Sequence, residues 1–173
     1  MPENTPELET PFWAFSLAVY AADGVAGECL GLQERLGLDV NLLLFAAYSG
    51  AVEGVRLEPQ DVASAHDAVA EWHAEIVRPM RTARRALKAP SANTADPLQP
   101  ASATLRTQVK RVELEAEQIE QAMLWQWSRT HLQDLAHDGG ALAANLRHVL
   151  ALYDDADAPS PRLIEAAIAY AAR

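Results

Sequence analysis

The sequence predicts an all-α protein, a compact bundle of six to seven helices with a kinked fourth helix and a long fifth helix. Apolar residues recur at spacings of three and four over most of the chain, and many of them are Ala, Leu and Val. Half of the 173 residues are hydrophobic and 22% are charged, which is enough for the core of a soluble domain. We therefore expect residues 1–173 to form a single helical domain.

The N-terminal third carries start and stop signals for three helices. We expect these helices at residues 11–22, 25–36 and 40–51. Thr10 with Pro11 opens the first helix, and Asp39 is the natural N-cap of the third. The polar residues 1–9 are expected to form a disordered lead-in.

The fourth helix begins at Pro59 and carries a single apolar seam as far as Ile76. Pro79 interrupts it, because the proline ring removes one hydrogen bond and clashes with the carbonyl four residues back. We expect a kink there, or a fresh helix with Pro79 in its first turn, continuing to about Lys88. Residues 89–100 hold three prolines with Ser, Asn and Asp, which predicts an internal Pro-rich linker.

The fifth and longest helical pattern covers residues 102–136. Its apolar residues follow a heptad-like spacing that suits near-antiparallel packing against the fourth helix across the linker. Two shorter helices are expected at residues 141–153 and 161–172, with an acidic turn between them.

The formal net charge of −10 favours a soluble protein and disfavours non-specific binding to nucleic acid or an anionic membrane. No uncharged apolar stretch reaches the roughly 18 residues of a transmembrane helix, so we expect no membrane insertion. The acidic start, MPENTPELE, is unlike a signal peptide. The single Cys29 allows no intrachain disulfide. We therefore expect a cytoplasmic protein of bacterial type.

Residues 78–88, around Pro79, hold five basic residues and no acid. The candidates for binding an anion or a partner are Arg78, Arg81, Arg84, Arg85 and Lys88. One interpretation is ion pairing with a row of acids on the fifth helix, Glu113, Glu117 and Glu120. The other is a site for a phosphorylated ligand, RNA or an acidic partner. The net charge and the lack of interleaved aromatic residues argue against nucleic acid.

The aromatic-rich N-terminal block could instead enclose a small-molecule or lipid-like ligand. The candidate pocket residues are Trp13, Tyr20, Gln33, Asp39, Asn41 and Tyr48. In the simpler interpretation Asp39 is a helix cap, and Asn41 is a buried amide that satisfies backbone groups of the preceding loop. The aromatic residues then belong to an all-round apolar core.

Catalytic and metal-binding patterns are weak. Cys29 lacks basic neighbours that would activate a thiol. His73 follows Glu71 by two residues rather than the three of a di-iron helix motif, and His66 and His73 share a face without an obvious third ligand. We therefore predict no catalytic residues, no metal and no cofactor. If the protein were an enzyme, Asp39, His73 and Arg81 would be the titratable or charged candidates.

The opening residues 11–20, PFWAFSLAVY, resemble the start of a family of short, uncharacterised bacterial helical proteins. The segments CLGLQ, residues 29–33, and GLDVNLLL, residues 37–44, fit the same pattern. The similarity extends through RPMRTARRALK, residues 78–88, and so covers about two thirds of the chain. The resemblance implies a domain of unknown function and assigns no catalytic residue.

These observations favour a non-catalytic helical module for protein interaction or regulation, with a protein partner or a second copy of the chain. Trp125 and Trp127 cannot both face the same way on one helix, so one of them is a candidate interface residue. Two alternatives remain, a small-molecule binder using the N-terminal aromatic core and an enzyme of unknown class.

Overall fold

The computed structural model describes residues 7–88, 98–132, 137–158 and 160–173, and about three quarters of them are helical. The elements are α1 Pro11–Tyr20, α2 Val25–Leu36, α3 Val40–Ala51, α4 Pro59–Trp72, the π-helix η1 His73–Val77, α5 Arg78–Ala86, α6 Gln99–His131, α7 Ala141–Ala151 and α8 Pro161–Ala171. Because α4, η1 and α5 run on without a break, they form one bent helix. The described chain therefore has seven helices, which confirms the predicted all-α bundle.

Local caps explain where the first helices begin. The Thr10 hydroxyl accepts a hydrogen bond from Trp13 N at 3.0 Å, and the Asp39 carboxylate accepts one from Asn41 N at 2.9 Å. Gly37 ends α2 in the left-handed conformation, with φ of 69°, which a residue with a Cβ rarely adopts. As a result, α2 and α3 have the predicted bounds.

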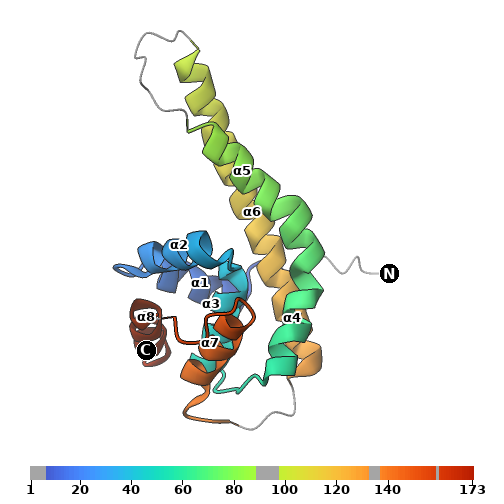
Figure 1. The fold of residues 1–173 in the computed structure, drawn as a ribbon, viewed down its shortest axis with the longest axis vertical. Helices are drawn as coiled ribbons and strands as arrows, with labels where there is room; N and C mark the ends of the chain where they lie inside the picture. The colour runs from blue at the N-terminus through green and yellow to red at the C-terminus, as the bar shows by residue number, and fades with distance from the viewer. Residues whose placement is uncertain (1–6, 89–97, 133–136, 159) are drawn as a thin grey trace.

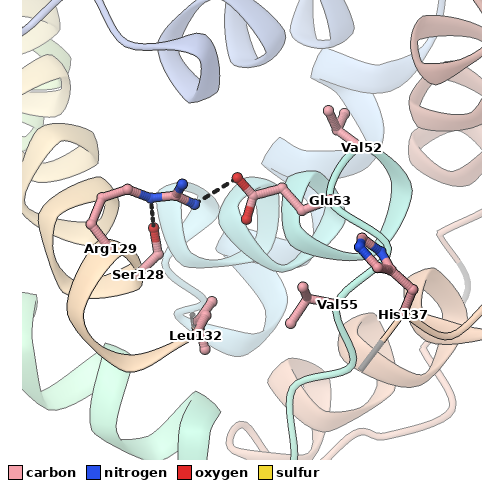
Figure 2. Close-up of a pocket in the computed structure, with 7 residues that line it drawn as sticks. All are labelled: Val52, Glu53, Val55, Ser128, Arg129, Leu132 and His137. Carbon is pink, nitrogen blue, oxygen red and sulfur yellow. Dashed lines mark hydrogen bonds and ion pairs between the residues drawn. The ribbon is translucent and has the colours of Figure 1, made fainter. Parts of the chain in front are cut away.

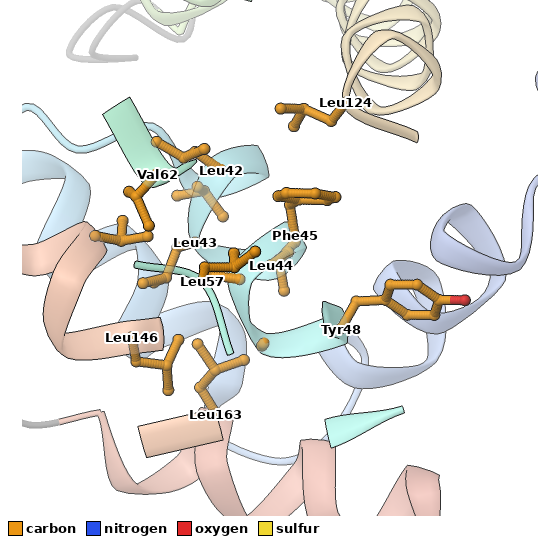
Figure 3. Packing of buried hydrophobic residues seen from close by; sticks show 14 of the residues in the cluster. Leu42, Leu43, Leu44, Phe45, Tyr48, Leu57, Val62, Leu124, Leu146 and Leu163 are labelled. Atoms are coloured by element: carbon orange, nitrogen blue, oxygen red, sulfur yellow. The ribbon is translucent and has the colours of Figure 1, made fainter. Parts of the chain in front are cut away.

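The core is organised around α3, whose residues from Val40 to Ser49 are all buried. Figure 3 shows Leu124 of α6 on one side of α3, and Leu146 and Leu163 of α7 and α8 on the other. Helices α3 and α7 approach very closely at Gly50, where an added Cβ would lie 2.5 Å from Leu142 Cα. A helix that is apolar all round is thus enclosed by its neighbours.

The bend in the fourth helix takes the form of the π-helix η1. The Arg78 N–H donates to the carbonyl of His73, five residues back, and Pro79 lies in the first turn of α5. Pro79 has no N–H to continue the ladder, so the predicted interruption occurs there as a bend within one continuous helix. The widened turn just before it was not predicted.

The long helix α6 runs antiparallel to this bent helix, and Figure 1 shows its first half extending with α5 away from the other helices. It begins at Gln99, three residues earlier than predicted, because Pro100 fits a first helical turn. Most of the predicted linker, residues 89–97, lies outside the described residues, as do residues 1–6 of the predicted lead-in. Leu8, in the described part of that lead-in, contacts α6, since its carbonyl oxygen accepts a hydrogen bond from Gln118 Nε2 at 3.3 Å.

Among the described residues, no single helix combines the length and the apolar character needed to cross a membrane. Helices α1 and α2 meet the same criterion only as a pair, across a bend of 96°.

Candidate functional site

The arm, which we define as α5 together with residues 99–112 of α6, is the most strongly basic part of the molecule. Residues 78–112 hold eight of the fourteen Lys and Arg but only one of the twenty-four Asp and Glu, namely Asp96. The rest of the chain is correspondingly acidic. The arm therefore places a positive surface on an otherwise negative protein.

Two of the five predicted basic residues pair internally where the arm joins the body. Arg84 makes a bidentate contact with Glu113, through Nε and through Nη2 at 3.1 Å. Arg81 Nη2 donates to Glu117 at 2.9 Å, and its Nε lies 3.5 Å from Glu113. The hydrogen bond with Glu113 raises the pKa of Arg84. This pairing supports the interpretation that Arg81 and Arg84 connect helices α5 and α6.

The other predicted basic residues face outward. Arg78 and Lys88 are exposed and form no ion pair with any residue that the structure describes. Arg85 lies 3.4 Å from Glu34, but both side chains are about half exposed or more. On α6, Lys110 is exposed as well. The predicted stripe is therefore divided into an internal pair and an outward-facing set.

Between the two helices of the arm lies an apolar hollow of about 480 Å³, which we call the arm groove. Its walls are formed by Pro79, Met80, Ala83, Leu105, Gln108, Val109 and Val112. Leu105 is 48% exposed and Val112 is 39% exposed, although the heptad-like pattern predicted both to lie at a helix interface. The arm thus combines exposed aliphatic surface with basic residues.

A second candidate site is buried near the point where the arm begins. Asp39 at the start of α3, His73 at the start of η1 and Glu120 of α6 form what we call the carboxylate–histidine cluster. His73 Nδ1 lies 3.1 Å from Glu120 Oε1 and 3.5 Å from Asp39 Oδ2. The side chains of Asp39, Glu120 and His73 are 4%, 0% and 13% exposed, respectively.

Two amides orient the cluster. Asn41 Nδ2 donates to Glu120 Oε2 at 2.9 Å, and Gln121 Nε2 donates to Asn41 Oδ1 at 2.9 Å. Asn41 is therefore a bridge between Glu120 and Gln121, rather than a partner of the loop backbone. Tyr153 closes the other side, since its hydroxyl oxygen accepts from Asp39 N at 3.2 Å.

Burial controls the protonation of this cluster. Loss of hydration raises the pKa of Asp39 to about 8, with a further contribution from the charge of Glu120 and an opposing one from His73. Burial also raises the pKa of Glu120 and lowers the pKa of His73. The raised pKa favours the protonated form of Asp39 at neutral pH.

We expect the metal-free protein to lose stability as pH rises from 7 to 8. Between pH 4 and 8 the folded state keeps a proton on Asp39 that the unfolded chain releases, so the free energy of unfolding should fall by about 1 kcal/mol per pH unit near pH 7–8. The lowered pKa of His73 acts in the opposite direction, but only below about pH 6.5. Urea unfolding at several pH values, with a chelator present, measures the slope.

In Asp39→Asn, which keeps a helix-capping side chain, this slope should be largely absent. The exposed Asp67→Asn variant is the matched control and should retain it. An equal slope in wild type and Asp39→Asn would mean that Asp39 is not the group responsible.

The remaining candidates of the N-terminal block have packing positions. Trp13 and Tyr48 are buried, and neither belongs to the walls of the arm groove. Tyr48 packs against Phe12, with ring centroids 5.5 Å apart. Tyr20 is half-buried, while Gln33 is buried and makes no hydrogen bond with Asp39 within the described chain.

Another pocket, of about 360 Å³, lies between the ends of α3 and α6 (Figure 2). The Arg129 guanidinium crosses it to Glu53 at 2.7 Å and also stacks over the Trp125 ring, 4.3 Å from its centroid. Trp127 is buried, so Trp125 is the more exposed of the two predicted tryptophans. Since Arg129 already pairs with Glu53, this pocket is partly closed by the protein's own charges.

Sequence reasoning missed the contribution of the outward bases of α6 and the assembly of the cluster. The antiparallel packing of α5 and α6 places the segment of α6 that carries Lys110 and Arg111 beside α5. Glu120 was predicted as a partner for the basic run but contacts His73 instead. A usable signal was the presence of two acids, Glu113 and Glu120, seven residues apart on the inward face of a helix.

Comparison with known proteins identifies a family but no activity. The family described as "Protein of unknown function (DUF2390)" matches residues 11–124. The match covers the N-terminal helices, the bent helix and the part of α6 that holds Glu113, Glu117 and Glu120. No curated protein and no solved structure matches the chain.

Proposed function

Because the chain belongs to the DUF2390 family of proteins of unknown function, we propose its function from its own surface: it is a helical module that binds an acidic protein segment along the arm. The observation that carries this proposal is the arm groove, an aliphatic strip on an arm whose other faces carry exposed basic residues. The proposed occupant is an amphipathic helix of a partner protein, with apolar residues on one face and Asp or Glu beside them.

The shape of the groove supports a helical occupant. Two antiparallel helices leave one apolar side uncovered, and a third helix can lay its own apolar ridge between them. Met80 from α5 and Val109 from α6 face such a ridge from the two walls. Burial of the exposed parts of Leu105 and Val112 would contribute to the binding free energy.

Charge complementarity supports an acidic occupant. Arg78, Lys88 and Lys110 have no ionic partner among the described residues, and Arg85 has only a distant, exposed one. An acidic helix would meet the favourable potential of the basic arm as it approaches, which speeds association and selects the partner. A second copy of the arm would instead bring like charges together.

Two other anionic surfaces fit the arm less well. Residues 78–112 contain no Phe, Trp or Tyr, so the arm has no aromatic platform on which nucleic-acid bases could stack. Helices that lie on membranes also commonly present Trp, Phe or Leu on an outward ridge. Here the aliphatic residues line a groove between two helices.

The proposed role is non-catalytic. Residues 78–112 contain no His, Cys or Glu, so the arm has few groups that could act as a general base or nucleophile. We include a cytoplasmic location in the proposal, supported by the acidic composition and by a lone cysteine, Cys29.

The test measures binding of a synthetic amphipathic helix that has Leu on one face and Glu on the others, by fluorescence anisotropy. We expect the double variant Arg78→Glu with Arg85→Glu to bind it about tenfold more weakly or worse, because both reversals oppose the acidic helix. The matched control reverses two exposed bases outside the arm, Arg147→Glu with Arg173→Glu, and should bind as the wild type does.

A second pair of variants separates the groove from general electrostatics. Val112→Asp places a charge in the groove and should abolish binding, whereas Leu114→Asp alters a somewhat more exposed residue of α6 outside it. If the protein bound the synthetic Leu/Glu helix and the same helix with Lys in place of Glu equally well, the proposal would be contradicted. Tighter binding to single-stranded RNA or to anionic lipid vesicles would contradict it as well.

A further inference from the structure

We propose that the carboxylate–histidine cluster binds a divalent transition-metal ion, with Asp39, His73 and Glu120 as its protein ligands. The fold brings one imidazole nitrogen and two carboxylate oxygens within 4.8 Å of one another from three separate helical elements. Mixed nitrogen and oxygen donors suit zinc, manganese or iron(II), whereas magnesium and calcium prefer oxygen donors alone.

The two distances from His73 match the edges of a coordination sphere, and the Asp39 and Glu120 oxygens lie within 4.8 Å of each other. With metal–ligand bonds of about 2.0–2.2 Å, neighbouring ligand atoms lie roughly 2.9–3.5 Å apart in octahedral or tetrahedral sites. His73 Nδ1 is 3.1 Å from Glu120 Oε1 and 3.5 Å from Asp39 Oδ2. An ion could therefore be accommodated with small side-chain adjustments and without moving the helices.

The hydrogen bonds of the cluster leave one oxygen of each carboxylate available to bind a metal ion. On Asp39, Oδ1 accepts from Asn41 N, while Oδ2 is the oxygen that approaches His73. On Glu120, Oε2 accepts from Asn41 Nδ2, while Oε1 approaches His73 most closely. Each carboxylate thus has one oxygen held by a hydrogen bond and the other turned toward the shared centre. In metal sites, hydrogen bonds from neighbouring residues orient the ligands in this way.

The charge of the cluster also favours a cation. Within the described chain, Asp39 and Glu120 form ion pairs with no Lys or Arg, and their only ionic contact is with His73. Two buried carboxyl groups at this separation repel each other when both are ionised. A divalent ion would compensate both charges, whereas the competing arrangement is a proton shared between them.

The backbone at His73 is itself unusual. It is the first residue of the π-helix η1, and single π turns occur frequently at functional sites. Trp72, just before it, is fixed by a hydrogen bond from its indole N–H to Ala116 O at 3.0 Å. His73 is the most exposed of the three proposed ligands, so we expect the ion to enter past its ring.

The experiment titrates chelator-treated full-length protein with ZnCl₂ and, separately, CoCl₂. Calorimetry should show one saturable Zn²⁺ site per chain, and Co²⁺ should give visible absorption bands of a bound ion. Zn²⁺ should raise the melting temperature of the wild type. His73→Gln and Glu120→Gln should each abolish the one-site binding, and Asn41→Ala should weaken it by about 10–100-fold.

The matched controls alter the same residue types outside the cluster. His66→Gln on α4 and Glu115→Gln on α6 should bind Zn²⁺ as the wild type does. Circular dichroism identifies a variant that fails to fold. If His73→Gln does so, Glu120→Gln, which keeps the side-chain shape, decides the outcome. The absence of one-site binding by the wild type, or its persistence in both ligand variants, would overturn the proposal in favour of a shared proton.

Discussion

Glu113→Ala is expected to lower the free energy of unfolding by about 3–5 kcal/mol, because it leaves two partly buried guanidinium groups without their shared carboxylate. Glu113 is 5% exposed and contacts both Arg81 and Arg84. Breaking a buried ion pair from one side costs more than the pair contributes, since the remaining charge stays desolvated. Urea denaturation monitored by circular dichroism measures the change.

Glu115→Ala is the matched control on the same helix. Its side chain is 62% exposed and lies 3.6 Å from the still more exposed Arg111, so its loss should cost less than about 1 kcal/mol. Similar losses in the two variants would show that the junction between α5 and α6 is not held by Glu113. They would also weaken the separation of the basic residues into an internal and an outward set.

Asn145→Ala is expected to cost at least about 3 kcal/mol, because three backbone groups would lose their partner in a dry interior. Asn145 is fully buried on α7. Its Oδ1 accepts from Leu57 N at 2.8 Å, and its Nδ2 donates to Val55 O at 2.8 Å and to Ala46 O at 3.3 Å. One side chain thus connects α7, α3 and the segment that leads into α4.

The neighbouring Arg147→Ala variant serves as its control. Arg147 is exposed on the same helix, so its truncation should change stability by less than about 0.5 kcal/mol. A small loss in Asn145→Ala, comparable with that of Arg147→Ala, would mean that water replaces the amide.

Much of the fold follows from local signals in the sequence. Helices α2 and α3 begin and end as predicted, because Gly37 and Asp39 determine the conformation of the chain between them. The position of the break at Pro79 was also predictable, since proline acts on its own helix. The π turn before it carries His73, which contacts Glu120 of α6, and no local pattern in the sequence reveals that contact.

The candidate sites were less predictable because they depend on contacts distant in the sequence. The helical spacing of Arg81 and Glu117 indicated that they could pair, and they do. By contrast, the residues near His73 in the sequence, such as His66 and Glu71, do not have the spacing of a metal site. The fold instead joins His73 to Glu120, 47 residues away, and to Asp39 on a third element. Spacing within one helix cannot indicate such a cluster.

Hydrogen exchange of the wild-type protein, with and without the synthetic Leu/Glu helix, tests the proposed arm surface most directly. If the helix occupies the arm groove, exchange should slow at the amides of α5 and of residues 99–112, while the amides of α7 and α8 remain unchanged. Protection confined to α7, α8 or the N-terminal helices, or no protection at saturating peptide, would contradict the proposal that the arm is the partner-binding surface.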